Sequence, residues 1–128
     1  MKAAPAGLHK ILIVDYDKGS RETLQMVLSA RGYAAVAVPD AEVGMSLLQD
    51  YVPDLIIAEI ILSRMNGLDF AREAVKRHPK CRVLLLAAQV ADDLVFQART
   101  AGFDFYDKPV NPPALIRRVS QLLSAAIS

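Results

Sequence analysis

Three charged residues stand at or just after short hydrophobic runs of this sequence. Asp15 follows the run 11–14, Glu59 closes the run 55–59, and Lys108 follows a shorter one. An unpaired charge inside a protein either costs several kcal/mol or becomes neutral, so such residues lie at a wet strand end or form a site. Two carboxylates and an ammonium group would suit a divalent cation or a stable ion-pair cluster. The simpler alternative is a solvated rim of charges.

Short hydrophobic runs alternate five times with longer amphipathic stretches, which is the pattern of a repeated βα unit. Asp40, Asn66 and Asn111 precede amphipathic stretches as N-cap residues. We predict strands at 11–14, 34–38, 55–59, 83–87 and 104–107. We predict helices over about 19–31, from Asp40 through Tyr51, from Asn66 to before Pro79, from Ala91 to before Gly102, and from Asn111 through Leu123.

The strands are hydrophobic on both faces, which predicts a parallel sheet covered by helices on both sides. With right-handed crossovers this is a doubly wound α/β fold of five strands. Ligands of such sheets bind at the carboxyl ends of the strands, so Asp15, Glu59 and Lys108 should converge on one edge, near the segment 87–89. We expect one domain over residues 9–128, preceded by a flexible leader at 1–8.

Composition excludes several classes of protein. The chain has 15 basic and 14 acidic residues, so it has no bulk field to attract nucleic acid. Its single cysteine, Cys81, permits no internal disulfide, which fits a reducing compartment. No stretch approaches the roughly 18 apolar residues of a membrane helix. We therefore expect a cytoplasmic protein whose chain binds neither nucleic acid nor membrane.

Motifs for other functions of this fold class are missing from the sequence. The segment 15–20 has one glycine where a dinucleotide-binding loop would have a Gly-x-Gly-x-x-Gly pattern, and no P-loop occurs elsewhere. His9 and His78 have no nucleophile nearby in the sequence, and we expect both at the surface. We therefore expect no enzymatic activity.

Several motifs at matching places make the sequence resemble the receiver domain of bacterial two-component response regulators, the CheY-like family. They extend over about nine tenths of the chain: Ile11-Leu12-Ile13-Val14-Asp15, Pro53-Asp54-Leu55-Ile56-Ile57, Asn66-Gly67-Leu68-Asp69-Phe70, Ala101-Gly102-Phe103-Asp104 and Lys108-Pro109. The resemblance implies a flavodoxin-like (βα)5 fold with strand order 2-1-3-4-5. It also implies that an aspartate on the third strand accepts a phosphoryl group from a sensor histidine kinase, with Mg²⁺ bound by two acids after the first strand. A hydroxyl ending the fourth strand and an aromatic residue on the fifth then rearrange.

This chain departs from the family pattern at the positions that carry this chemistry. Glu59 replaces the phosphate-accepting aspartate, Tyr16 the second acid, Ala87 the switch hydroxyl, and Ser63-Arg64 the usual Pro-Gly pair. The family residues that remain are Asp15, the aromatic switch residue Phe105, and Lys108 with Pro109, a proline that the family tends to hold in cis.

These substitutions predict impaired chemistry. Glutamate places its carboxylate about 1.5 Å further out than aspartate, and a misplacement of about 1 Å can cost a hundredfold in rate. Asp15 and Glu59 with Lys108 supply less negative charge than the family pocket, so we expect no Mg²⁺ binding or only weak binding. Without a hydroxyl at Ala87, the switch lacks its hydrogen-bonding group.

We therefore expect an atypical receiver domain that signals by protein contact, with a sensor histidine kinase or another signalling protein as partner. Glu59 should pair with Lys108, either imitating a phosphorylated aspartate or persisting as a structural relic. The alternatives are a working phospho-receiver that uses Mg²⁺ and a domain that binds a small molecule in the vacated pocket. The fourth and fifth helices and the fifth strand could form a homodimer face, with mixed charges at Asp92, Asp93, Arg99, Asp107, Arg117 and Arg118.

Overall fold

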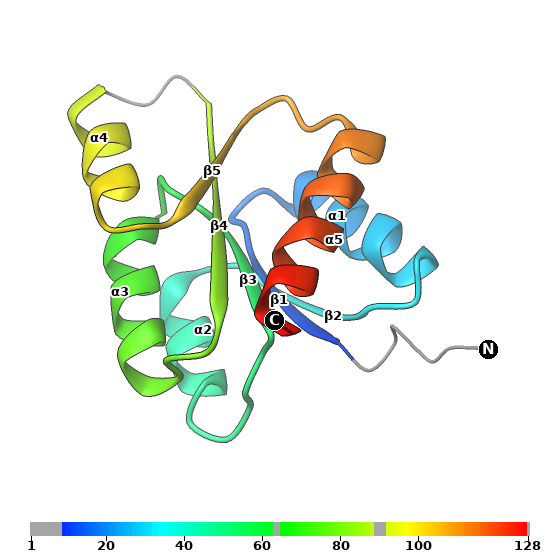
Figure 1. Ribbon diagram of the computed structural model, residues 1–128, viewed down its shortest axis with the longest axis horizontal. Coiled ribbons are helices and arrows are strands. Elements are labelled where there is room, and N and C mark those ends of the chain that lie inside the picture. Colours follow the sequence, from blue (N-terminus) through cyan, green and yellow to red (C-terminus); the bar gives the residue numbers. More distant parts are fainter. Residues whose placement is uncertain (1–8, 63–64, 89–91, 128) are drawn as a thin grey trace.

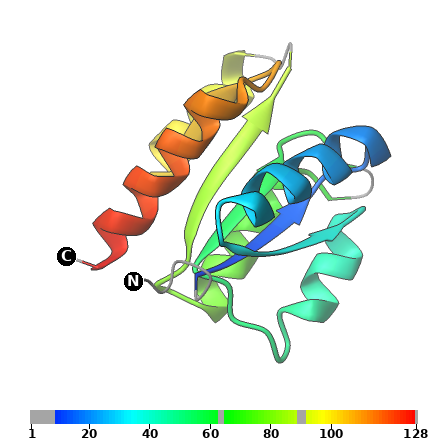
Figure 2. The same cartoon turned by 90° about the vertical axis from the view of Figure 1, so that its right-hand side faces the viewer.

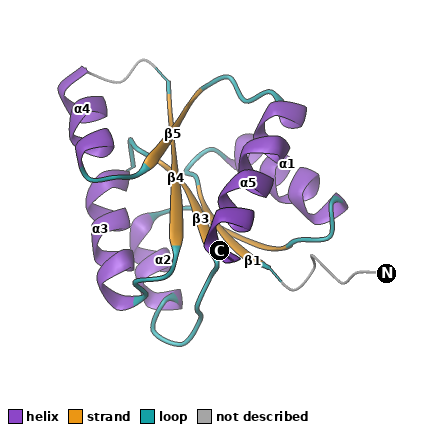
Figure 3. Cartoon of the chain, viewed as in Figure 1, coloured by secondary structure: helices purple, strands orange, loops and turns teal. Residues whose placement is uncertain are grey.

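The computed structural model describes residues 9–62, 65–88 and 92–127. The expectations for the leader at 1–8, for Ser63-Arg64, and for Gln89 and Ala91 lie outside the described residues. Five parallel strands form one sheet in the order β2-β1-β3-β4-β5, which confirms the predicted doubly wound fold (Figures 1 and 3). The strands are β1 (Lys10–Val14), β2 (Ala34–Val38), β3 (Leu55–Glu59), β4 (Arg82–Ala87) and β5 (Asp104–Asp107).

Helices cover both faces of the sheet (Figures 1 and 2). They are α1 (Lys18–Ala30), α2 (Ala41–Leu47), α3 (Gly67–Arg77), α4 (Asp92–Thr100) and α5 (Pro112–Ile127). Successive strand residues point to opposite faces, so Ile11 and Ile13 of β1 pack with α1 and α5, whereas Leu12 and Val14 pack with α2, α3 and α4. Within the described residues, no helix combines the length and the apolar character that spanning a membrane requires.

The predicted helix from Asp40 through Tyr51 was too long. Helix α2 ends at Leu47, with Leu48 as its C-cap residue. The two amides after Leu48 form i to i−3 hydrogen bonds, from Gln49 N to Ser46 O and from Asp50 N to Leu47 O, both 3.3 Å, so the chain continues as a tighter turn. Tyr51 follows the helical spacing because it packs against the same core from outside the helix.

Both histidines, which we expected at the surface, are half-buried. The Nε2 atom of His78 lies 2.9 Å from the carbonyl oxygen of Leu48, so this ring links the end of α3 to the end of α2. The sequence could not predict this contact between His78 and Leu48, because the two residues are 30 positions apart.

The strand register places the candidate site residues side by side. Val14 of β1 is level with Ala58 of β3, so Asp15 and Glu59 follow at the same edge. Helix α3 begins against this edge at Gly67, where a Cβ atom would lie 2.0 Å from the carbonyl oxygen of Glu59. Only glycine allows this close approach of two backbone segments.

Candidate functional site

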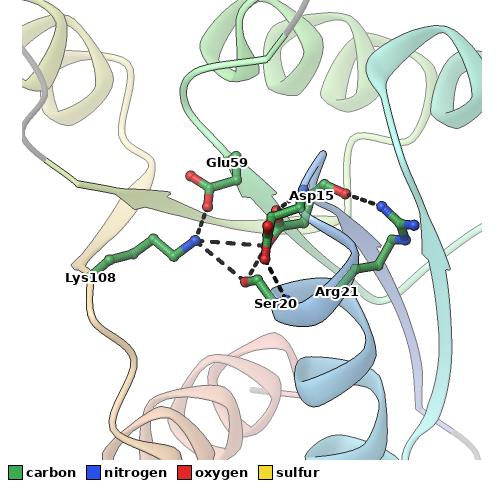
Figure 4. A network of polar contacts seen from close by, with 6 residues as sticks. Asp15, Ser20, Arg21, Glu59 and Lys108 are labelled. Carbon is green, nitrogen blue, oxygen red and sulfur yellow. Dashed lines mark hydrogen bonds and ion pairs between the residues drawn. The ribbon is translucent and has the colours of Figure 1, made fainter.

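Asp15 is completely buried at the carboxyl end of β1. Its Oδ1 atom accepts a hydrogen bond from the amide of Asp17 at 2.9 Å, and its Oδ2 atom accepts one from the Ser20 hydroxyl at 2.5 Å. Arg21 donates to the carbonyl oxygen of Asp15 at 2.9 Å (Figure 4). Both carboxylate oxygens of Asp15 are therefore engaged by the start of α1.

Glu59 and Lys108 form the ion pair that we expected, since the Lys108 ammonium donates a hydrogen bond to Oε1 of Glu59 (Figure 4). The same Nζ atom lies 3.8 Å from Oδ2 of Asp15 and 3.4 Å from the Ser20 hydroxyl. Glu59 is 5% exposed, so the alternative of a solvated rim of charges is wrong. We call Asp15, Ser20, Glu59 and Lys108 the carboxylate–lysine cluster.

The backbone holds Lys108 in place at the end of β5. Its amide donates to the carbonyl oxygen of Ala87 at 2.8 Å, and the peptide bond to Pro109 is cis, as the resemblance implied. The cluster therefore ties the carboxyl ends of β1, β3 and β5 together, with β4 contributing a backbone carbonyl.

Burial and charge act against each other in the cluster. Burial raises the pKa of Glu59, and the Lys108 hydrogen bond and charge oppose this rise only in part. For Lys108, burial lowers the pKa, but the hydrogen bond to Glu59 and the neighbouring carboxylates outweigh burial, so its pKa is raised. The ammonium is therefore the well-stabilised charge of the pair.

The remaining predicted site residues lie around this cluster. Tyr16 is 60% exposed, whereas Ala87 is buried in the core. Phe105 is half-buried and packs against the core cluster that contains Ala87, with the Arg99 guanidinium 5.7 Å from the centre of its ring. Pro109 is exposed.

Sequence reasoning missed Ser20, which donates to Asp15. The sequence feature that could have indicated Ser20 is the start of the helix. Asp17 is the N-cap residue of α1 and accepts a hydrogen bond from the Ser20 amide at 2.8 Å. A hydroxyl in the first turn of this helix lies beside the end of β1, and only the packing of α1 shows that it faces Asp15.

The cluster fits a magnesium ion poorly. Mg²⁺ needs near-octahedral oxygen ligands at about 2.1 Å, but both oxygens of Asp15 accept hydrogen bonds and the Oε1 atom of Glu59 faces an ammonium. Across the part of the chain that the structure describes, no group of three or more His, Cys, Asp or Glu side chains could hold a metal ion.

A hollow of about 320 Å³ lies beside the cluster between α1 and α5. Asp17, Ser20 and Lys108 are among its polar lining residues, and Leu24, Val27 and Leu115 are among its apolar ones. Asp15 and Glu59 do not line it, so it differs from the vacated pocket in which we considered a small-molecule ligand.

An ion pair between Arg118 and Asp104 lies within the expected dimer face. Arg118 of α5 donates two hydrogen bonds to the carboxylate of Asp104, at 3.0 and 3.1 Å, and is half-buried. The other charged residues of that face, Asp92, Asp93, Arg99, Asp107 and Arg117, are exposed. Dimerisation through this face stays a prediction.

Comparison with known proteins agrees with this geometry. The sequence profile described as the response regulator receiver domain matches residues 11–120. The chain belongs to this family. A solved structure of a CheY-like response regulator receiver domain protein from Methanospirillum hungatei JF-1 superposes with a TM-score of 0.89 at 25% identity, covering 93% of this chain and 96% of the other.

Among curated proteins, this receiver domain is 28% identical over 116 residues to the transcriptional regulatory protein CpxR of Klebsiella pneumoniae, covering 91% of this chain and 50% of CpxR. It is 31% identical over 114 residues to an uncharacterized 14.6 kDa protein of Leptolyngbya boryana, with 87% of each chain covered. The chain thus spans about half the length of the matched transcriptional regulator.

Proposed function

We propose that this chain is an atypical receiver domain that signals by protein contact, with phosphorylation and Mg²⁺ binding impaired and with no enzymatic activity of its own. One observation carries this proposal. The carboxylate at the acceptor position, Glu59, is already bound to Lys108, and the carboxylate of Asp15 is fully engaged by α1. The groups that would receive a metal ion and a phosphoryl group are thus occupied by the protein itself.

The length of the side chain at position 59 supports the proposal. The extra methylene of glutamate extends the carboxylate by about 1.5 Å, toward the Lys108 ammonium. Attack on phosphorus requires a positioned carboxylate, and displacement by about 1 Å can reduce the rate a hundredfold. Ala87 offers no hydroxyl to a phosphoryl group, and Tyr16 brings no carboxylate to a metal.

We further propose that the Glu59–Lys108 pair holds the domain in one signalling state. The pair joins the end of β3 to Lys108, the first residue of the loop after β5. It therefore fixes the position of this loop. A sensor histidine kinase or another signalling protein in the cytoplasm would recognise this fixed state. On this view Glu59 supplies a permanent negative charge where the family uses a reversible one.

A phosphorylation assay tests the first part of the proposal. The purified chain is incubated with a small-molecule phosphodonor and Mg²⁺, and its intact mass is measured. We expect no phosphorylated species. The matched control is the variant Tyr16→Asp/Glu59→Asp, which restores both acids of the family pattern and should gain one phosphoryl group. A phosphorylated wild-type chain would instead support a working phospho-receiver.

Partner affinity tests the second part. Glu59→Gln keeps the side-chain shape but removes its charge, so binding to a captured partner should weaken if the pair sets the signalling state. Equal affinity of the variant and the wild type would mean that Glu59 is a structural relic. Asp69→Asn, on the exposed side of α3, is the control for a lost carboxylate.

A further inference from the structure

Two hollows lie at the amino ends of the strands, at the opposite edge of the sheet from the carboxylate–lysine cluster. The larger, about 720 Å³, lies between the start of β4 and the start of β5. The smaller, about 470 Å³, lies beside the segment that leads into β3. Both are lined by the turn Pro79–Cys81 between α3 and β4, which is at the lower end of β4 in Figure 1. We call this surface the α3–β4 surface.

Unpaired cations concentrate on the α3–β4 surface. Lys80 lines both hollows, Arg82 lines the larger and Arg77 the smaller, and all three are exposed. Within the described part of the chain none of the three forms an ion pair, although Arg77 donates weakly to a carbonyl oxygen of α2 at 3.4 Å. Each of these cations is therefore available to an anionic group outside the chain.

The two acids that line the hollows are already engaged. Asp104 accepts two hydrogen bonds from Arg118 and forms an ion pair with it at 3.0 Å. Asp54 accepts a hydrogen bond from the backbone amide of Lys10 at 2.7 Å. Asp54 keeps its negative charge, because the amide is neutral, but the three unpaired cations outnumber it, so the net field of the surface is positive.

Apolar groups lie between the cations. Val75, Phe103 and Leu122 line the larger hollow, and all three are only partly buried. Val52 lines the smaller hollow and is 55% exposed. A surface that pairs apolar depressions with cations matches a ligand that carries both apolar and acidic side chains.

We infer that the α3–β4 surface binds an acidic segment of a partner protein, with an apolar side chain placed in a hollow and carboxylates on Lys80 and Arg82. Nucleic acid fits less well, because the chain has a net charge of +1 and a sequence pI of about 7.9, and its cations do not form an extended stripe. The inference is independent of the phosphorylation chemistry, since it uses the other end of the strands.

The inference is tested by titrating the isotope-labelled 128-residue chain with a synthetic peptide of repeating Asp-Glu-Leu units. Changes in the backbone amide chemical shifts locate the binding site, and fluorescence anisotropy measures the affinity. We expect shifts to concentrate at 77–83 and 101–104. The double variant Lys80→Ala/Arg82→Ala should bind about three- to tenfold more weakly, as for two exposed ion pairs. Binding should also weaken as salt rises.

The control variant is Arg72→Ala/Lys76→Ala, which removes the same charge from cations that pair with Asp69 and Glu73 on α3. Its affinity should stay within about twofold of the wild type. Equal losses in both double variants, or absent binding, would overturn the inference. So would equal affinity for a peptide of repeating Asp-Glu-Ser units or for single-stranded oligothymidine, because the apolar contacts would then be irrelevant.

Discussion

Removing the Lys108 ammonium should strongly destabilise the domain at neutral pH. In Lys108→Met, the carboxylates of Asp15 and Glu59, with side chains 1% and 7% exposed, lose their shared counter-ion. Breaking a buried ion pair from one side costs about 3–5 kcal/mol, and the partial exposure of Lys108 places the expected loss near about 3 kcal/mol. That is a large part of the roughly 5–15 kcal/mol that stabilises a typical domain.

The loss should depend on pH in a defined direction. Without the ammonium, the pKa of Glu59, already raised by burial, lies further above its unfolded value. Above the folded-state pKa, Glu59 is fully ionised and the variant bears the full cost of a buried carboxylate without a counter-ion. As pH falls through that pKa, Glu59 binds a proton and this loss of stability becomes smaller. The destabilisation at about pH 5 should therefore be smaller than at about pH 7.5.

Urea unfolding followed by circular dichroism measures both effects, since the chain has no tryptophan for fluorescence. The control is Lys76→Met, whose ammonium pairs with Glu73 at 3.2 Å but is 74% exposed, and which should change stability by no more than about 0.5 kcal/mol. The reasoning fails if Lys108→Met loses less than about 1 kcal/mol at neutral pH, or if its loss is the same at both pH values.

Three further predictions concern the surroundings of the cluster. Gly67→Ala should cost at least about 3 kcal/mol in unfolding experiments, because its Cβ would lie 2.0 Å from the backbone oxygen of Glu59. Ser20→Ala should cost about 1.5–3 kcal/mol, because Asp15 loses a charge-assisted hydrogen bond of 2.5 Å. In the wild type, the stabilisation from the raised pKa of Lys108 should be complete below the ordinary lysine pKa of about 10.4 and vanish as pH rises through the folded-state value.

Matched variants control for these three changes. Gly19→Ala places a Cβ 3.5 Å from the Asp17 carboxylate, an ordinary contact, and should be nearly neutral. Ser29→Ala lies on the exposed side of α1 and should change stability little. Lys108→Met should not show the loss of stability at alkaline pH that we expect for the wild type. Equal effects in a variant and its control would contradict the corresponding prediction.

The sequence alone determined the fold and the three charged residues of the cluster. Buried parallel strands need near-continuous hydrophobic runs, and those runs are local features that can be counted along the chain. Charged residues at their ends are equally visible, so Asp15, Glu59 and Lys108 were predicted to meet at one edge. The strand order followed from the family resemblance, and the structure confirms it.

Only the tertiary structure decided which hydrogen bonds and packing contacts surround these residues. Ser20 reaches Asp15 only because α1 packs over the end of β1, and Gly67 is required only because α3 starts against the backbone of Glu59. The contact of His78 with Leu48 likewise depends on how the end of α3 packs against the end of α2. Periodicity reports which face of a segment is buried, but contacts between distant segments depend on packing distances that no local pattern contains.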